Sequence, residues 1–197
     1  MSTTAWVVLG VALALGVWAV SVYNRLAQLR NRIANAFGQI DVQLKRRYDL
    51  VPNLVEVARG YLAHEAATLE AVIKARGQAV DAAGAARATP ANAQALGALA
   101  AAEGVLGTSL GRLMVVAEAY PELKADATMQ SLSEELTSTE NRLGFARQAY
   151  NDQVLEFNDR AARFPDLIVA RLLGFSVQPM LESTRSQEER MAPQVKF

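Results

Sequence analysis

The sequence predicts an all-α protein in which an N-terminal transmembrane helix is followed by an up-and-down four-helix bundle. Three observations lead to this prediction. The chain begins with a long uncharged apolar segment, and 51% of its 197 residues are hydrophobic. Further along, apolar residues recur at spacings of three and four, which is the period of one helix face. Between residues 20 and 80, Gly and Pro are sparse and Ala, Leu, Glu, Gln and Arg dominate, a composition that favours helix.

Residues 1–23 are predicted to form the transmembrane anchor, with residues 5–23 in contact with the lipid bilayer. No charged side chain occurs before Arg25, and nineteen residues of helix span roughly 28 Å, about one hydrocarbon core. Trp6 lies near one end of the segment and Trp18 near the other, where interfacial aromatic residues are common. A cleaved signal peptide is the alternative, but the basic region that would begin it is absent, and "AVS" is a poor cleavage site.

The charges that follow the anchor predict its orientation. Arg25, Arg30 and Arg32 come soon after it, and no acidic residue appears before Asp41. Because positive charges are retained on the cytoplasmic side, we expect a very short N-terminus outside and the remainder of the chain in the cytoplasm.

The composition excludes several classes of protein. The 20 Lys and Arg residues balance the 20 Asp and Glu residues, so we expect no general basic surface and no nucleic-acid partner. The chain contains no Cys, which excludes disulfides, thiolate catalysis and Cys-ligated metal.

We expect the bundle to occupy residues 24–164, with four apolar stripes along its helices. The first comprises Leu26, Leu29, Ile33, Phe37, Ile40 and Leu44. The second comprises Val51, Leu54, Ala58, Tyr61, Leu62, Leu69, Val72 and Ile73. The third comprises Leu96, Leu99, Leu106, Leu110, Leu113 and Ala117. The fourth comprises Leu132, Leu136, Leu143, Ala146, Tyr150, Val154, Phe157, Ala161 and Phe164. The near-heptad spacing of the fourth stripe suits antiparallel bundle packing.

Several residues are predicted to mark helix ends. Thr89 is expected to N-cap a helix that begins at Pro90. Ser131 and Glu134 have the spacing of a capping box, and Pro165 is expected to close the fourth helix.

The chain beyond the bundle is predicted to form two further parts. Residues 165–182 are more apolar than a connector needs to be, so we expect them to lie on the lipid headgroups or to contact another subunit. Residues 183–197 have the composition of a polar tail.

A proline interrupts the helical pattern in "QLKRRYDLVPNLV", residues 43–55. Pro52 removes one backbone donor and disfavours α conformation at Val51, so we expect a tight reversal there, with Asp49 as the N-cap of the next helix. The alternative is a three-helix bundle with a long first helix kinked at Pro52, because the apolar residues keep helical phase across the proline.

The basic run of the same stretch is predicted to be structural. A straight helix from Tyr23 to Lys45 is roughly 33 Å long, well beyond a Debye length of about 8–10 Å, which disfavours a simple lipid contact. Residues 24–50 carry six basic and two acidic side chains, and residues 121–160 carry eight acidic and four basic ones. We therefore expect the run to lie in the last turn of a helix and to face acids of the fourth helix.

Two long blocks of the sequence carry a family resemblance. They read "YNRLAQLRNRIANAFGQIDVQLKRRYDLVPNLVEVARGYLAHEAATLEAVIKAR" (23–76) and "AYPELKADATMQSLSEELTSTENRLGFARQAYNDQVLEFN" (119–158). Both resemble the signatures of the LemA family of bacterial membrane-anchored proteins. The resemblance implies an N-terminal anchor, an up-and-down four-helix bundle, no settled enzymatic activity and a role in organising the membrane. The chain departs from the family at Phe37, near which Trp is usual, and in its Ala-rich residues 82–104.

The sequence presents no arrangement of residues suited to catalysis. The single histidine, His64, stands in "HEAAT", which lacks the second histidine of a zinc helix. Glu134 and Glu135 are adjacent and point about 100° apart on a helix, so we expect them to be solvated. We therefore predict no enzymatic activity, no catalytic residue, no cofactor and no metal.

Other polar residues are candidates for structural or partner contacts. We expect a polar network that comprises Glu140, Arg142, Arg147 and Asp152 together with Asn141 and Asn151. The full set of candidates is Lys45, Arg46, Arg47, Asp49, Pro52, Glu140, Asn141, Arg147, Tyr150 and Asn151.

These observations lead us to expect a single-pass protein of the bacterial cytoplasmic (inner) membrane that acts as a scaffold. We expect a homo-oligomer, because Gly10 and Gly16 permit close helix packing in lipid. The alternative is an adaptor that recruits a membrane protein partner, such as a protease or sensor, through the bundle surface. An enzyme or ligand-binding bundle is a third hypothesis, which the absence of catalytic groups disfavours.

Overall fold

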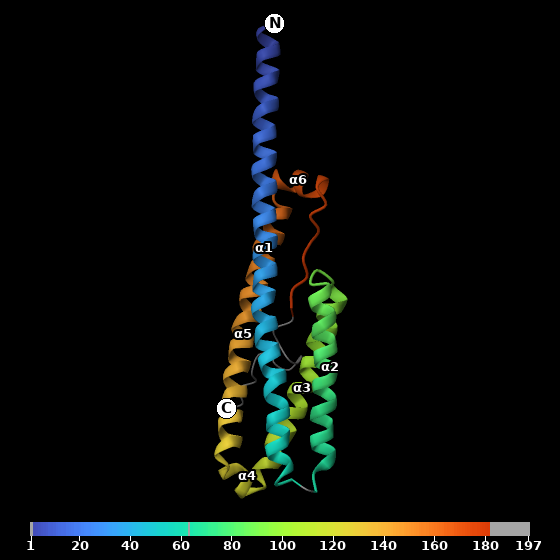
Figure 1. Cartoon of the computed structure of the whole chain (residues 1–197). Helices are drawn as coiled ribbons and strands as arrows, with labels where there is room; N and C mark the ends of the chain where they lie inside the picture. Colours follow the sequence, from blue (N-terminus) through green and yellow to red (C-terminus); the bar gives the residue numbers. More distant parts are fainter. Residues whose placement is uncertain (1, 63, 182–197) are drawn as a thin grey trace, which may run out of the picture.

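The computed structural model describes residues 2–62 and 64–181, and the regular structure of this part of the chain is entirely helical (Figure 1). The helices are α1 (Thr3–Arg59), α2 (Ala66–Ala88), α3 (Ala93–Glu118), α4 (Pro121–Ala125), α5 (Ala127–Ala162) and α6 (Asp166–Leu172). The all-α prediction is confirmed. The predicted polar tail, residues 183–197, lies outside the described residues.

Four long helices, α1, α2, α3 and α5, lie roughly along one direction, and successive ones run in opposite senses (Figure 1). The closest pairs are α1 with α5, α2 with α3, and α1 with α2. The short α4 turns the chain between α3 and α5, and α6 packs against both α1 and α5. The C-terminal end of α5 therefore lies beside α1, near the point at which the N-terminal part of α1 projects alone (Figure 1).

The core is built from the predicted apolar stripes. Every residue of the first stripe, from Leu26 to Leu44, is buried, and so is every residue of the third. Three stripe residues are exposed instead: Tyr61 by 38%, Ile73 by 45% and Phe164 by 81%. Tyr61 and Phe164 lie just beyond the ends of α1 and α5, where the helical period no longer decides which way a side chain points.

The predicted reversal at Pro52 is wrong, because α1 passes through this residue and continues to Arg59. Pro52 is exposed, while Val51 and Leu54 beside it are buried, so the apolar face continues across the proline. Packing of that face outweighs the local bias against helix at the residue before a proline. The chain reverses instead between Arg59, where α1 ends, and Ala66, where α2 begins. Neither the predicted reversal at Pro52 nor the alternative of a long first helix kinked at Pro52 placed the turn there.

A hydrogen bond from α2 satisfies the backbone group that Pro52 leaves without a partner. In an α-helix the amide of residue 52 would bond to the carbonyl oxygen of Tyr48, but proline has no N–H. Nε of Arg76 donates to that oxygen at 2.7 Å. The side chain of Arg76 is half-buried, so the replacement bond is partly shielded from water.

Two predicted caps are also wrong. The cap of α3 is Asn92, whose side-chain oxygen accepts from the amides of Gln94 and Ala95, while Thr89 follows the end of α2. The cap of α5 is Asp126, which accepts from the amide of Met129 at 2.8 Å. Ser131 and Glu134 therefore lie inside α5. Both α3 and α5 begin after an extended residue whose side chain reaches an unpaired amide, and the spacing of residues alone does not identify such a residue.

The N-terminal part of α1 exposes its apolar side chains on all sides. Trp6, Val8, Leu13 and Val17 are each more than half exposed, whereas Val22 is buried by the rest of the chain. Length and composition suit this segment for crossing a membrane. Helix α3 meets the same criterion, but its apolar stripe is buried within the chain.

Candidate functional site

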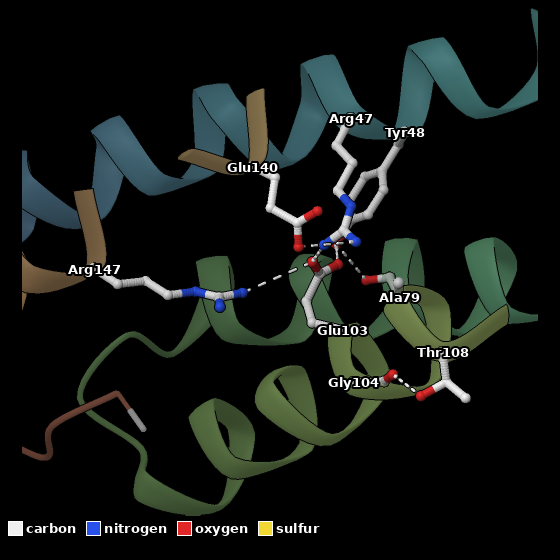
Figure 2. A network of polar contacts seen from close by, with 8 residues as sticks. All are labelled: Arg47, Tyr48, Ala79, Glu103, Gly104, Thr108, Glu140 and Arg147. Carbon is white, nitrogen blue, oxygen red and sulfur yellow. Dashed lines mark hydrogen bonds and ion pairs between the residues drawn. The ribbon is translucent and has the colours of Figure 1, made fainter. Parts of the chain in front are cut away.

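A buried charged centre lies where α1, α3 and α5 face one another (Figure 2). Its principal pair is Arg47 on α1 and Glu103 on α3, with 2.7 Å between Nη1 and Oε2. Each of these side chains is 3% exposed. A charged pair this deeply buried is costly unless its geometry is good, and removal of one partner leaves an uncompensated charge.

The helical period explains why these charges are buried. Arg47 follows Leu44 by three residues and precedes Val51 by four, so it shares their inward face. Glu103 stands in the same way between Leu99 and Leu106 on α3. An ionic side chain inside an apolar stripe is the signal that could have identified both residues as a pair from sequence.

Tyr48 completes the coordination of the Glu103 carboxylate. Its hydroxyl is 2.7 Å from Oε1 of Glu103 and 3.2 Å from the carbonyl oxygen of Ala79 on α2. The single hydroxyl proton can be donated to only one of these acceptors at a time, and the shorter distance favours Glu103. Burial raises the pKa of Tyr48, and the negative charge of Glu103 raises it further. The phenol therefore remains protonated and acts as a donor.

Two residues of α5 extend the centre. Nη2 of Arg47 is 3.9 Å from Oε1 of Glu140, and Nη2 of Arg147 is 3.8 Å from Oε2 of Glu103. Burial lowers the pKa of Arg147, the charge of Glu103 opposes that shift, and the charge of Arg47 adds to it. The two arginines and two glutamates balance in charge, so the centre links three helices without a net charge in the interior.

The three cations of the basic run have different surroundings. Lys45 pairs with Asp49 one turn further along α1, at 2.7 Å and largely exposed to solvent. Arg46 pairs with Glu135 on α5. Arg47 points into the buried centre instead. The run does not lie in a last helical turn, because α1 continues for twelve residues beyond Arg47.

The predicted network on α5 is divided by the structure. Glu140 and Arg147 join the buried centre, while Asn141, Arg142 and Asp152 are exposed. The remaining member, Asn151, belongs to a different contact, together with the further candidate Tyr150.

That contact holds the extended segment 175–181 against α5. Asn151 bonds to both backbone groups of Leu181, at 2.9 and 2.8 Å, and Asn158 does the same for Gln178, at 2.8 and 2.9 Å. The hydroxyl of Tyr150 donates to the carbonyl oxygen of Pro179 at 3.0 Å. Asn151 and Asn158 are seven residues apart, which corresponds to a rise of about 10.5 Å along the helix. Their partners, Leu181 and Gln178, are three residues apart, which corresponds to about 10 Å of extended chain, so the spacings of the two pairs match.

An open pocket of about 980 Å³ adjoins the buried centre. Small residues of α3 form much of its wall, Pro179 and Met180 border it, and three arginines line it: Arg47, Arg112 and Arg147. Glu103 is the carboxylate among the lining residues. Arg112 is exposed, whereas the other two arginines are engaged with Glu103.

The described residues contain no group of His, Cys, Asp and Glu that could hold a metal ion. His64 is exposed in the turn after α1. In the buried centre, Tyr48 is held protonated and the oxygens of Glu103 are engaged by Arg47 and Tyr48. The arrangement therefore suits stable association of helices better than proton transfer. Sequence reasoning missed Tyr48, Arg76, Glu103 and Asn158, all of which make specific contacts here.

These features define an all-helical protein with an exposed apolar N-terminal helix and a buried polar centre. The profile of the LemA family matches residues 36–197. The chain therefore belongs to the LemA family.

Three magnetosome proteins are similar to part of the chain. It is 33% identical over 78 residues to MamQ 1 and to MamQ 2 of Paramagnetospirillum magneticum, which is 40% of this chain and 29% of each relative. It is 28% identical over 99 residues to MamQ of Magnetospirillum gryphiswaldense, which is 50% of this chain and 36% of that protein. The match thus spans about a third of the length of these curated relatives.

Proposed function

We propose that the protein is a membrane-anchored, non-enzymatic scaffold that self-associates and organises the membrane or its proteins. The observation that carries the proposal is the division of α1 into two parts. Its large apolar side chains from Trp6 to Val17 are exposed, Trp18 and Ala19 are partly buried against the core, and from Val22 onward the same helix forms part of the core. An anchor that continues without a break into the packed body suits a protein that holds its body at a fixed position relative to the bilayer.

The body is proposed to act as an up-and-down four-helix bundle built from α1, α2, α3 and α5. The contact of α1 with both α5 and α2 supports this arrangement, as does the buried centre that joins α1 to α3 and α5. The likeness to magnetosome proteins is compatible with a role in organising a membrane. A non-enzymatic role agrees with a polar centre in which the ionisable groups are engaged with one another.

Self-association within the bilayer is supported by the open small-residue face of the anchor. A Cβ atom added to Gly16 would have no heavy atom within 4 Å, and Ala12 lies one turn earlier on the same face. Small residues at this spacing allow two helices to approach closely in lipid.

Native mass spectrometry of the full chain in mild detergent tests the proposal. We expect an oligomer, and we expect Gly16→Leu to shift the population toward monomer. Gly38→Leu is the matched control, since Gly38 is equally open but lies in the body of α1. A chain that is monomeric under all mild conditions would remove self-association from the proposal, and recovery of the full chain in the soluble fraction of cells would remove the anchor.

We further propose that the protein resides in the bacterial cytoplasmic (inner) membrane, with the N-terminus outside and the body in the cytoplasm. The arginines that follow the anchor support this orientation. Because the chain has no Cys, a cysteine added near residue 190 can be labelled alone. We expect protection from an impermeant maleimide in intact spheroplasts and labelling after lysis, whereas labelling in intact spheroplasts would reverse the orientation.

The second candidate function is an adaptor that recruits a protease or sensor at the membrane. The open pocket beside α3 favours it, because the exposed Arg112 offers a partner charge that is not needed for the buried centre. In-cell crosslinking is expected to lose a specific partner on Arg112→Glu and to retain it on Arg59→Glu, an exposed charge at the end of α1. An unchanged set of crosslinked partners would argue against this function.

A further inference from the structure

Helix α6 lies at the level where the exposed apolar part of α1 ends. Figure 1 shows α6 across the long helices, with α1 extending alone beyond it. Val22 is 3% exposed, and the ring of Tyr23 lies 5.8 Å from that of Phe175, just after α6. From Thr3 to Val22 the helix rises roughly 28 Å, close to the ~30 Å of a hydrocarbon core. If the segment crosses a bilayer, the boundary of the hydrocarbon therefore falls beside α6.

The two faces of α6 differ in their surroundings. Asp166, Val169 and Ala170 are buried. On the other side, Ile168 is 48% exposed and Leu172 is 78% exposed, and these two residues are separated by one helical turn. Phe164 before the helix and Leu173 after it are 81% and 54% exposed. Four large apolar side chains are thus open to solvent within ten residues.

The structure holds this short helix firmly in place. Nε of Arg160 lies 2.5 Å from Oδ2 of Asp166, which ties the end of α5 to the start of α6. Gly174, at φ +73°, ends α6 in a Schellman motif, in which the amide of Phe175 bonds to the carbonyl oxygen of Ala170 at 2.9 Å. Phe175 then returns to the core, 6.2 Å from the ring of Phe157. The apolar side chains of α6 are therefore presented at a fixed position.

The charges around this surface are positive. Residues 163–181 contain two exposed arginines, Arg163 and Arg171, and one acid, Asp166, which is buried and paired with Arg160. An amphipathic helix with exposed arginines beside large apolar residues has the composition that binds an anionic membrane surface.

We propose that α6 lies in the headgroup region of the bilayer that holds the anchor, with Phe164, Ile168, Leu172 and Leu173 reaching the acyl chains. This membrane-surface contact rests on the proposed anchor and adds a second attachment point, which sets the depth of α1 and the tilt of the body. A bilayer is favoured over a second copy of the chain because α6 packs against α1 near the point at which its exposed apolar part ends, and because the arginines of this surface match anionic lipid headgroups.

Site-specific quenching tests the proposal on the full chain. Because there is no native Cys, the single-cysteine variants L172C, L13C and V115C can each carry one bimane label. The chain is reconstituted into vesicles of phosphatidylcholine and phosphatidylglycerol, with or without brominated acyl chains. Val115 is the matched control, since it is 73% exposed and lies near the end of α3 that adjoins α4, remote from α6 (Figure 1). Leu172 is so exposed that its replacement removes no packing from the core.

We expect several-fold stronger quenching at residue 172 than at residue 115, and strong quenching at residue 13. Quenching at residue 13 with none at residue 172 would overturn the surface contact and leave the anchor intact. A blue-shifted label at residue 172 that brominated lipid does not quench would assign the surface to another protein copy and overturn the proposal. Absence of quenching at residue 13 would overturn both the anchor and the inference that rests on it.

Discussion

Nε of Arg76 on α2 donates a hydrogen bond to the main-chain carbonyl oxygen of Tyr48 on α1, and this oxygen is the one that Pro52 leaves without its helical partner. The contact explains how a proline persists inside a helix of 57 residues. It also links α1 to α2 next to the buried charged centre, in which the side chain of the same Tyr48 takes part.

Replacement of Arg76 by Met is expected to destabilise the protein by about 1–3 kcal/mol, because the carbonyl oxygen of the buried Tyr48 loses the side-chain donor that replaces its helical partner. The same change in a Pro52→Ala background is expected to cost less, since the alanine amide restores the helical bond to Tyr48. Urea unfolding of the full chain in mild detergent, followed by circular dichroism, measures both costs. Arg142→Met serves as the control, because Arg142 is exposed on α5. Equal costs in the two backgrounds would show that Arg76 acts independently of the proline.

Replacement of Glu103 by Gln is expected to destabilise the protein by about 3–5 kcal/mol, because it leaves Arg47 buried without its principal counter-charge. The double variant Arg47→Met with Glu103→Met is expected to be more stable than Glu103→Gln, since it removes both charges together. The same unfolding measurement compares them. If the double variant is the less stable of the two, the centre contributes through its hydrogen bonds rather than through its charge balance.

Alkaline pH is expected to destabilise the fold through Tyr48. Its pKa is raised in the folded state, so its contribution is complete below the ordinary tyrosine pKa of about 10 and is lost progressively as the pH rises above that value. Tyr48→Phe is expected to reduce the loss of melting temperature between neutral pH and pH values above about 10. Tyr23→Phe is the comparison, since Tyr23 lies outside the buried centre. An identical alkaline profile in the Tyr48→Phe variant would contradict this assignment.

Asn151 and Asn158 each hold one residue of segment 175–181 by a pair of hydrogen bonds, and replacement of either asparagine is expected to free only that residue. Asn158→Ala is expected to accelerate hydrogen exchange at the amide of Gln178, and Asn151→Ala at the amide of Leu181, because each asparagine accepts from that amide. Gln148→Ala, at an exposed position of α5, is the control. Exchange that rises equally at both amides in either variant would show that the segment opens as one unit.

Local pattern predicted much of this fold. The stripes from Leu26 to Leu44 and from Leu96 to Ala117 are buried as their spacing predicts, because burial of one helix face is set by a period of 3.6 residues. The uncharged N-terminal segment is likewise the exposed apolar part of α1. Family membership was also recognisable from the sequence, since the two blocks that resemble LemA proteins lie largely within the matched residues 36–197.

Contacts between distant residues decided the rest. Its sequence neighbours alone predict that Pro52 ends the helix. The helix continues because packing and Arg76, 24 positions away, compensate for the backbone hydrogen bond that the proline cannot donate. In the sequence, Arg47 is one of three consecutive basic residues that would be expected on the surface. It is buried because Glu103, on another helix, balances its charge. The sequence by itself determined the helical class, the apolar N-terminal segment and the inward faces of the helices, because these depend on local composition and period. Only the tertiary structure decided where the chain turns, which charges are buried and where α6 presents its apolar surface. Those outcomes depend on contacts with residues of other helices, which the pattern along a single helix does not specify.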